Sequence, residues 1–258
     1  MEIATSADGT PIAFERSGEG PVVVIVNGAL STASDASGLA SALVDAGFQA
    51  VSWDRRARGS SGDARGSEPE REVEDLAAVI DALGDSVSVL GHSSGAVLAL
   101  FAASRGVPIE ALFLSEPPLR FGEDEPADDL AERLQSLVDR GDAAEAVTTF
   151  QLENVGLPQE MVDQIRASDQ FAGLIPLAQS CVYDTLLVQK VSTPTREMLT
   201  VSQPVTVLRG EQTFPMLITA ADRLADELDH AELVVVPESV MHRPDPEATA
   251  AVVRERVR

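Results

Sequence analysis

The chain has 258 residues, of which 44% are hydrophobic and 24% are charged, a composition typical of folded globular proteins and not of disordered or fibrous ones. Its 19 basic and 42 acidic residues leave a formal net charge of −23 at pH 7. A field of that sign repels phosphate backbones and anionic bilayers, so nucleic acid and membrane partners are not expected.

The first half of the chain alternates strand and helix patterns. Strands are predicted at Pro11–Ser17, Val22–Val26, Gln49–Trp53, Ser86–Leu90 and Ile109–Leu114. Helices are predicted near Ser34–Ala46, after the capping-box spacing of Ser67-Glu-Pro-Glu70, and at Gly95–Ser104. Helices inserted between strands in this way indicate βαβ units and a mostly parallel sheet, which is an α/β fold.

The alternation stops after the strand Ile109–Leu114. Across residues 119–202, apolar side chains recur only at helical spacing. Strand patterns return at Val205–Leu208 and Leu233–Val236. A last helix is predicted after Asp245-Pro246, because Asp at the N-cap followed by Pro is a strong helix start. An all-helical segment therefore interrupts the α/β pattern.

The sequence gives no sign of a metal, a cofactor, a disulfide or an export signal. Cys181 is the only cysteine, and the three histidines include no pair at close metal-ligand spacing. No Gly-x-Gly-x-x-Gly or P-loop pattern marks a nucleotide site. The first residues lack the basic and apolar regions of a signal peptide, and no apolar run is long enough to cross a bilayer. We therefore expect a cytoplasmic protein that needs no cofactor.

The pentapeptide Gly91-His-Ser-Ser-Gly95 lies between a predicted strand and the apolar helix that follows it. A Gly-x-Ser-x-Gly sequence at such a junction is typical of a nucleophile elbow, a turn so tight that its neighbours must lack side chains. The turn exposes the hydroxyl of Ser93, and the helix N-terminus behind it favours developing negative charge. Ser93 is therefore the candidate nucleophile, although a plain turn would also use glycine and serine.

With this motif in its context, the chain resembles the α/β-hydrolase fold superfamily over nearly its full length, and in particular its cap-bearing bacterial members with a serine nucleophile. The matching segments are Val26-Asn-Gly-Ala29, Asp54-Arg-Arg-Ala-Arg-Gly-Ser-Ser61, Gly91-His-Ser-Ser-Gly95, Ser115-Glu-Pro-Pro118 and Val240-Met-His242. The resemblance implies a mostly parallel central sheet flanked by helices, with an all-helical cap inserted after the sixth strand. Residues 1–118 and 203–258 would form the core, and residues 119–202 the cap.

A serine nucleophile needs a base, because a free hydroxyl is almost entirely protonated near pH 7. His242 follows the predicted strand Leu233–Val236 by a loop, the position where this family carries its catalytic histidine. The order of serine before histidine along the chain also agrees with the family. His92 is adjacent to the nucleophile and His230 precedes the last strand, so His242 is the expected base.

The sequence leaves three possibilities open for the acid that should accompany the histidine. Most of the family has an aspartate after the seventh strand in a Gly-x-x-Asp context, but this chain reads Gly210-Glu-Gln-Thr213. Glu116 is the favoured substitute, because it ends the strand beside the nucleophile's strand and some relatives place their acid there. Glu211 is the second choice, and the absence of any acid is the third.

An acyl-transfer site also needs donors for the oxyanion. The amide of Ser94, directly after the nucleophile, would supply one. The resemblance places the second in the loop after Val22–Val26, where Gly28 allows a sharp turn and the Ala29 amide would donate. Asn27 stands where relatives often have histidine, and we include it among candidate substrate-binding residues, the alternative being that its side chain orients the loop.

Three residues of the predicted cap, Phe171, Tyr183 and Asp184, are further candidates for the substrate pocket, the alternative being that the apolar faces of these helices pack on one another. The loop Asp54–Gly59 resembles the family's Asp-x-Arg-Gly loop, with Ala57 in place of a glycine. We interpret it as structural and expect its charges to pair within the loop.

The leading hypothesis is a serine hydrolase that cleaves a small to medium carboxylic ester or related acyl compound through an acyl-enzyme, acting as a monomer or homodimer on a small-molecule substrate. A serine at position 93 excludes the branches of the family that use an aspartate nucleophile. One alternative is non-hydrolytic or carbon–carbon chemistry on the same fold, such as a lyase, a C–C bond hydrolase or a cyclase in a biosynthetic pathway. Another is a catalytically silent ligand-binding member.

Overall fold

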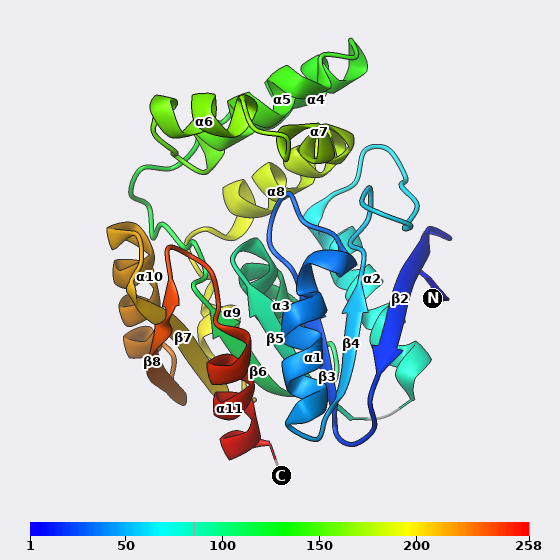
Figure 1. The fold of residues 1–258 in the computed structure, drawn as a ribbon, viewed down its shortest axis with the longest axis vertical. Helices are drawn as coiled ribbons and strands as arrows, with labels where there is room; N and C mark the ends of the chain where they lie inside the picture. Colours follow the sequence, from blue (N-terminus) through cyan, green and yellow to red (C-terminus); the bar gives the residue numbers. More distant parts are fainter. Residues whose placement is uncertain (85, 258) are drawn as a thin grey trace.

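The computed structural model describes residues 1–84 and 86–257, and in that part of the chain eight strands form one sheet at the centre of the molecule (Figure 1). The strands are β1 (Glu2–Thr5), β2 (Pro11–Ser17), β3 (Val22–Val26), β4 (Gln49–Trp53), β5 (Val87–His92), β6 (Ile109–Ser115), β7 (Val205–Gln212) and β8 (Ala231–Val240). They lie side by side in the order β1-β2-β4-β3-β5-β6-β7-β8.

The sheet is mostly parallel, as the sequence predicted. Only the pairs β1–β2 and β2–β4 are antiparallel, and every pairing from β4 to β8 is parallel. In this order β5 lies between β3 and β6, so the loops after these three strands meet at one edge of the sheet. The sequence analysis did not predict β1, which is only four residues long and buries a single side chain, Ala4.

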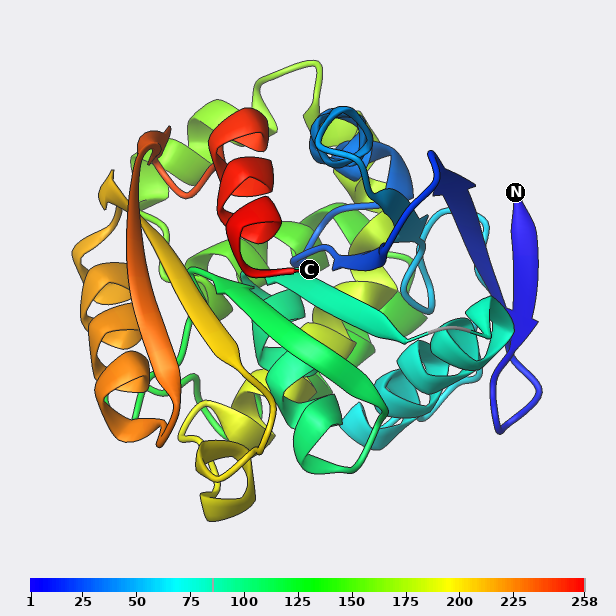
Figure 2. The ribbon, with the colours of Figure 1, turned by 90° about the horizontal axis from the view of Figure 1, so that it is seen from below.

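Helices cover both faces of the sheet (Figure 2). On one face lie α1 (Ser37–Asp45), which follows the 3-10 turn Ala33–Ala36, and α11 (Pro246–Arg256). On the other face lie α2 (Pro69–Leu83), α3 (Ser94–Ser104) and α10 (Pro215–Glu227). The carboxylate of Asp245 accepts a hydrogen bond from the Ala248 amide, as expected for the predicted start of α11.

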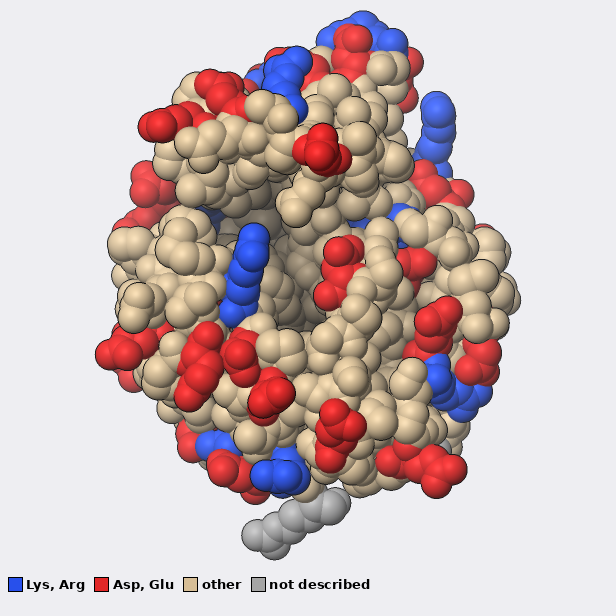
Figure 3. Space-filling model, in the orientation of Figure 1, with Lys and Arg blue, Asp and Glu red and all other residues tan. Residues whose placement is uncertain are grey.

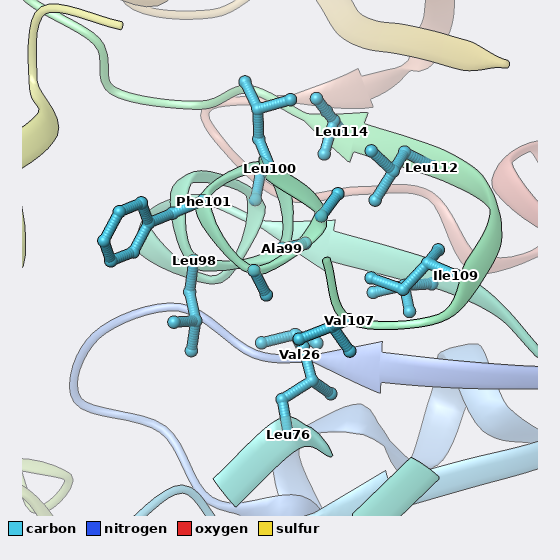
Figure 4. Packing of buried hydrophobic residues seen from close by; sticks show 14 of the residues in the cluster. Val26, Leu76, Leu98, Ala99, Leu100, Phe101, Val107, Ile109, Leu112 and Leu114 are labelled. Atoms are coloured by element: carbon cyan, nitrogen blue, oxygen red, sulfur yellow. The ribbon is translucent and has the colours of Figure 1, made fainter. Parts of the chain in front are cut away.

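The helix α3 is buried on all sides, as its unbroken apolar sequence predicted. Its side chains, among them Leu98 and Leu100, pack against residues of the neighbouring strands such as Val26 and Leu114 (Figure 4). Burial of this helix fixes the position of the turn that precedes it, because a helix that is apolar all round has no alternative solvent-facing orientation.

Only helical elements occur between β6 and β7, and the chain there is described without a gap (Figure 1). They are α4 (Leu130–Asp139), α5 (Ala143–Thr149), a π-helical turn (Phe150–Asn154), α6 (Gln159–Arg166), α7 (Phe171–Leu174), a 3-10 turn (Ile175–Leu177), α8 (Ala178–Val191) and α9 (Arg196–Leu199). Helices α4 to α7 form a layer beyond the sheet, and α8 runs beneath them. The division into a core and a cap at residues 119–202 stays a prediction.

Helix α8 packs in two different environments. Cys181 and Tyr183 belong to an apolar cluster with α4 and α5, whereas Leu187 and Val191 belong to the main core beside α3. Continuous helical structure over Phe171–Val191 is long and apolar enough to span a membrane by those two criteria, but 61% of its most apolar window is buried inside the molecule. It therefore has the burial of a core helix of a globular fold.

One predicted local feature is wrong. The capping-box spacing of residues 67–70 places the N-cap of α2 at Ser67, but the N-cap is Glu68, and no side-chain hydrogen bond caps the helix. The Ser67 hydroxyl instead accepts a hydrogen bond from Arg56. Ser67 therefore helps Asp75 and Asp8 to satisfy the buried Arg56 guanidinium and does not cap the helix.

Candidate active site

Ser93 occupies a strained turn between β5 and α3. Its φ and ψ angles are 55° and −129°, a region that residues with a side chain rarely adopt. A Cβ atom at Gly91 would lie 2.5 Å from the Ala96 Cα, and one at Gly95 would lie 2.1 Å from the Val26 carbonyl oxygen. Glycine is therefore required on both sides of Ser93, which is the geometry expected of a nucleophile elbow.

Glu116 and His242, far apart in the sequence, are hydrogen-bonded to each other. Nδ1 of His242 lies 2.6 Å from Oε2 of Glu116. The same carboxylate accepts hydrogen bonds from the Gly210 amide (2.9 Å) and the Thr213 hydroxyl (3.0 Å). Burial alone would raise the pKa of the Glu116 carboxyl, but these hydrogen bonds, above all the one from His242, hold it below its ordinary value.

Both residues of this pair leave their strands in unusual backbone conformations. Glu116 follows β6 with φ of 47°, and His242 follows β8 with φ of 62°. The structure therefore brings the favoured acid, Glu116, to the histidine. The second candidate, Glu211, is exposed on β7 and has no hydrogen bond to His242 among the described residues.

Ser93 and His242 line the same cavity, which has a volume of about 890 Å³ and lies between the helical layer and the sheet. Figure 3 shows a hollow on this face of the molecule. Because Nδ1 of His242 is engaged with an ionised carboxylate, Nε2 is the ring nitrogen left to accept a proton from a hydroxyl in the cavity.

The two predicted oxyanion donors, Ala29 and Ser94, also line this cavity. Ser94 is the first residue of α3, so its amide has no acceptor within the helix. The Ala29 amide donates to no atom of the described residues. A Cβ atom at Gly28 would lie 2.8 Å from Cβ of Ser93, so only glycine lets this loop approach the nucleophile so closely.

The remaining cavity wall is largely apolar. Its hydrophobic lining comes from Leu30, Phe150, Val155, Leu157, Ile165, Val188, Phe214, Met216, Leu217 and Met241. Asp184, a pocket candidate from the sequence, does line the cavity, and the wall also contains three polar residues that the sequence did not indicate, Arg120, Asn154 and Arg243. Such a wall suits a ligand with a substantial apolar part and a small number of polar contacts.

Three residues expected to contact substrate are not among the residues that line the cavity. Asn27 donates its side-chain amide to the Thr32 carbonyl oxygen (2.7 Å), which holds the loop in shape. Tyr183 donates its hydroxyl to Asp63 (2.7 Å), and Phe171 is buried in the apolar cluster of the helical layer. For these two aromatic residues the structure shows the alternative, in which they pack within the helical layer or bond to a neighbouring loop.

A buried network of charges lies beneath the cavity. Arg55 forms two hydrogen bonds with Glu72 and lies 3.0 Å from Asp184, and Arg58 lies 2.7 Å from Asp184. All four side chains are at most 1% exposed. Burial alone would raise the pKa of Asp184, but Arg55 and Arg58 lower it overall, so the carboxylate is ionised.

The sequence-based expectation that the charges of the loop Asp54–Gly59 pair within the loop is therefore wrong. Its arginines pair with carboxylates of α2 and α8, including a fully buried pair of Arg56 with Asp75 (2.6 Å). Only Asp54 bonds locally, accepting from the Ser60 amide. Each buried guanidinium needs a carboxylate, and the loop offers none that is free.

His92 packs against the candidate base. The two imidazole rings lie with their centroids 4.6 Å apart. Burial and then the neighbouring His242 lower the pKa of His92 to about 3, so its ring is neutral near pH 7. Within residues 1–84 and 86–257, no group of three or more histidine, cysteine or acidic side chains could hold a metal ion.

The elbow, the histidine–carboxylate pair and the parallel sheet define a member of the α/β hydrolases, and comparison with known proteins agrees. The sequence model of the alpha/beta hydrolase family matches residues 23–253, and the chain belongs to this family. An alpha/beta hydrolase from Sphaerobacter thermophilus is 40% identical, with a TM-score of 0.90 over 98% of this chain and 99% of that one.

Other solved structures are similar in fold. A thermophilic esterase from Thermogutta terrifontis is 21% identical, with a TM-score of 0.73 over 98% of this chain and 96% of that one. A meta-cleavage product hydrolase from Pseudomonas fluorescens is 16% identical, with a TM-score of 0.63 over 99% of this chain and 96% of that one. The comparison with curated protein sequences gives no significant match.

Proposed function

We propose that the protein is a serine hydrolase that cleaves a small to medium carboxylic ester, or a related acyl compound, with a largely apolar acyl or alcohol part. The observation that carries the proposal is the hydrogen bond of Glu116 to His242, which lines the same cavity as Ser93. A serine, a histidine and an ionised carboxylate in this relationship form the arrangement that activates a hydroxyl. Membership of a hydrolase family supports the reaction class.

The reaction would begin when the Ser93 hydroxyl attacks the substrate carbonyl and His242 takes its proton at Nε2. The negative charge on the carbonyl oxygen would be stabilised by the amides of Ala29 and Ser94. Collapse of this intermediate would release the alcohol, which receives its proton from His242. Water activated by the same histidine would then hydrolyse the acyl-enzyme and release the acid. No cofactor takes part in these steps.

Glu116 would hold His242 in the tautomer that leaves Nε2 free and would stabilise the imidazolium as it forms. Its lowered pKa supports this role, because the carboxylate must be negatively charged to do so. The apolar lining of the cavity supports a substrate with an uncharged, hydrophobic part. The esterase from Thermogutta terrifontis, 21% identical to this chain, is one similar structure with ester chemistry. A cytoplasmic location and a monomeric or homodimeric state stay predictions.

The first test is intact-mass analysis after treatment with a small fluorophosphonate, with Ser93→Ala as the control. The expected result is a single covalent adduct on the wild-type protein that is absent in Ser93→Ala. A panel of esters and thioesters would then define the substrate. A folded wild-type protein that forms no adduct and hydrolyses no ester would contradict the proposal and favour a ligand-binding role, and an adduct without ester turnover would favour carbon–carbon or non-hydrolytic chemistry.

A further inference from the structure

The carbonyl oxygen of Gly28 is held by two donors. Nη1 of Arg58 lies 2.7 Å from it, and Oγ of Ser31 lies 2.6 Å from it. A peptide unit is planar and trans, so its N–H points opposite to its C=O. The carbonyl of Gly28 and the amide of Ala29 belong to one such unit, and whatever fixes the first also fixes the second.

The direction set in this way is the one the reaction needs. Arg58 is 1% exposed and does not line the cavity, so the Gly28 carbonyl points into the protein. The Ala29 amide therefore points to the opposite side, where Ala29 lines the cavity beside Ser93, and it has no acceptor among the described residues. A reversed peptide would present a carbonyl oxygen to the oxyanion and repel it.

Asp184, on α8, connects this peptide to the other predicted donor. One carboxylate oxygen lies 2.7 Å from Nη2 of Arg58, and the other accepts a hydrogen bond from Oγ of Ser94 (2.7 Å). Arg55 donates to the same Ser94 hydroxyl (3.1 Å) and to the Asn27 carbonyl (3.3 Å). Both segments that carry oxyanion donors are therefore tied to one carboxylate from the helical segment between β6 and β7.

We propose that Arg58 and Asp184 are positioning residues that set the oxyanion hole: Arg58 orients the Gly28–Ala29 peptide, and Asp184 holds Arg58 and Ser94 at a fixed separation. The proposal rests on the proposed serine hydrolase function and adds to it two residues that touch no reacting atom. It gives the buried charges of the loop Asp54–Gly59 a role in catalysis beyond stability.

The charge balance of the network decides how the proposal is tested. Arg55 and Arg58 carry two positive charges, and Glu72 and Asp184 carry two negative charges. Removing one member would leave a buried charge without a counter-charge, which destabilises a protein severely. The double variant Arg58→Gln/Asp184→Asn removes one charge of each sign and avoids this.

A matched control lies in the same loop. Arg56 and Asp75 form an equally buried ion pair, but neither residue lines the cavity or contacts Gly28 or Ser94. The double variant Arg56→Gln/Asp75→Asn therefore imposes the same change of charge and a comparable loss of stability. Because Asp184 also lines the cavity, a difference in kcat between the two double variants, and not one in KM, reports on the oxyanion hole.

The expected result for Arg58→Gln/Asp184→Asn is a fall in kcat of about 10- to 100-fold with KM nearly unchanged, because a misoriented donor weakens binding of the transition state and not of the substrate. The rate of reaction with a fluorophosphonate should fall by a similar factor, since its phosphoryl oxygen occupies the oxyanion site. The control should keep the wild-type kcat. Equal losses in both variants, or a loss confined to KM, would overturn the proposal.

Two further measurements keep the outcome decisive. If the double variant does not fold, Arg58→Lys is the substitute. Lysine keeps the positive charge but cannot donate to Gly28 and Asp184 from one planar group, so kcat should fall about tenfold. A wild-type kcat in Arg58→Lys would overturn the proposal. A crystal structure of whichever variant folds should show the Gly28–Ala29 peptide reoriented. An unchanged peptide orientation would overturn this proposal, whether or not the wild-type protein hydrolyses an ester. Failure of the hydrolase proposal itself would be seen separately, as a wild-type protein that reacts with the fluorophosphonate no better than Ser93→Ala.

Discussion

Thr213 donates its hydroxyl to the same carboxylate oxygen of Glu116 that His242 contacts, at a distance of 3.0 Å. Position 213 is where most resembling proteins carry their acid, as the Gly-x-x-Asp context after the seventh strand indicates. In this chain the carboxylate that bonds His242 follows the neighbouring strand β6, and Thr213 donates a hydrogen bond to that carboxylate. The two positions therefore serve one histidine from two adjacent strands, β6 and β7.

Replacing Glu116 by glutamine should reduce kcat by at least about 100-fold at pH 7, because a neutral amide cannot stabilise the imidazolium and can favour the wrong tautomer. Glu211→Gln is the matched control, since that side chain is an exposed carboxylate close by in the sequence, and it should leave turnover unchanged. The measurement is steady-state hydrolysis of an activated ester. Equal activity of wild type and Glu116→Gln would remove Glu116 from the mechanism.

The acid should be transferable between the two positions. Thr213→Asp in a Glu116→Ser background places a carboxylate directly after β7, next to the space that the glutamate vacates. We expect kcat of the double variant to be about tenfold higher than that of Glu116→Ser, because a carboxylate near Nδ1 of His242 restores the tautomer and the negative charge. The comparison is kcat of the double variant against Glu116→Ser alone. No recovery in a folded double variant would show that position 213 cannot reach the histidine.

The strained backbone at Ser93 should be detectable in the free energy of unfolding of two variants, Ser93→Gly and Ser93→Ala. At φ of 55° and ψ of −129° a side chain is unfavourable, so Ser93→Gly should be more stable than Ser93→Ala by about 1 kcal/mol in urea unfolding. Glu74, partly exposed on α2, provides the control, because there Gly should be less stable than Ala by about 1 kcal/mol. The same order at both positions would mean that Ser93 is not strained.

His92 should make the protein less stable as the pH falls below neutrality. Its pKa is about 3 in the folded protein against 6.5 for an unperturbed histidine. Between these values the unfolded chain binds a proton that the folded protein does not, so stability falls with decreasing pH, by about 1.4 kcal/mol per pH unit for one such residue.

The variant His92→Phe keeps a ring beside His242 and removes this titration. Its free energy of unfolding, measured in urea from pH 7 to pH 4.5, should fall less steeply than that of the wild type. Because the other titrating groups are common to both proteins, the difference between the two curves isolates position 92. Parallel curves would contradict the lowered pKa.

Those parts of the fold that depend on local pattern were predictable. The β-branched run Val22–Val26 and the apolar helix Gly95–Ser104 could be identified as buried elements, because each is apolar on every face and therefore has no side suited to solvent. The elbow was predictable because its glycines are sterically required. Glu116 could be favoured over Glu211 because the resemblance to the α/β hydrolases implied a strand order in which this strand lies beside the one that bears Ser93.

The parts that depend on distant partners were not predictable. Asp184 is one acidic residue among 42, and only the folded chain shows that it meets Arg58, which is 126 residues away. The bonds of Tyr183 with Asp63 and of Ser67 with Arg56 are of the same kind. Periodicity assigns such residues to a helix or a loop but carries no information about which charge or cavity lies opposite.

The divided packing of α8 has a consequence for engineering this scaffold. Its second half is part of the core beside α3, and Asp184 near its middle is bonded to the residue after the nucleophile. Recombination with a relative should therefore exchange residues 119–177 and retain α8 as part of the recipient. A chimera that exchanges residues 119–202 would replace α8 and with it Asp184, the buried partner of Arg55 and Arg58, whereas one that exchanges residues 119–177 would retain these ion pairs.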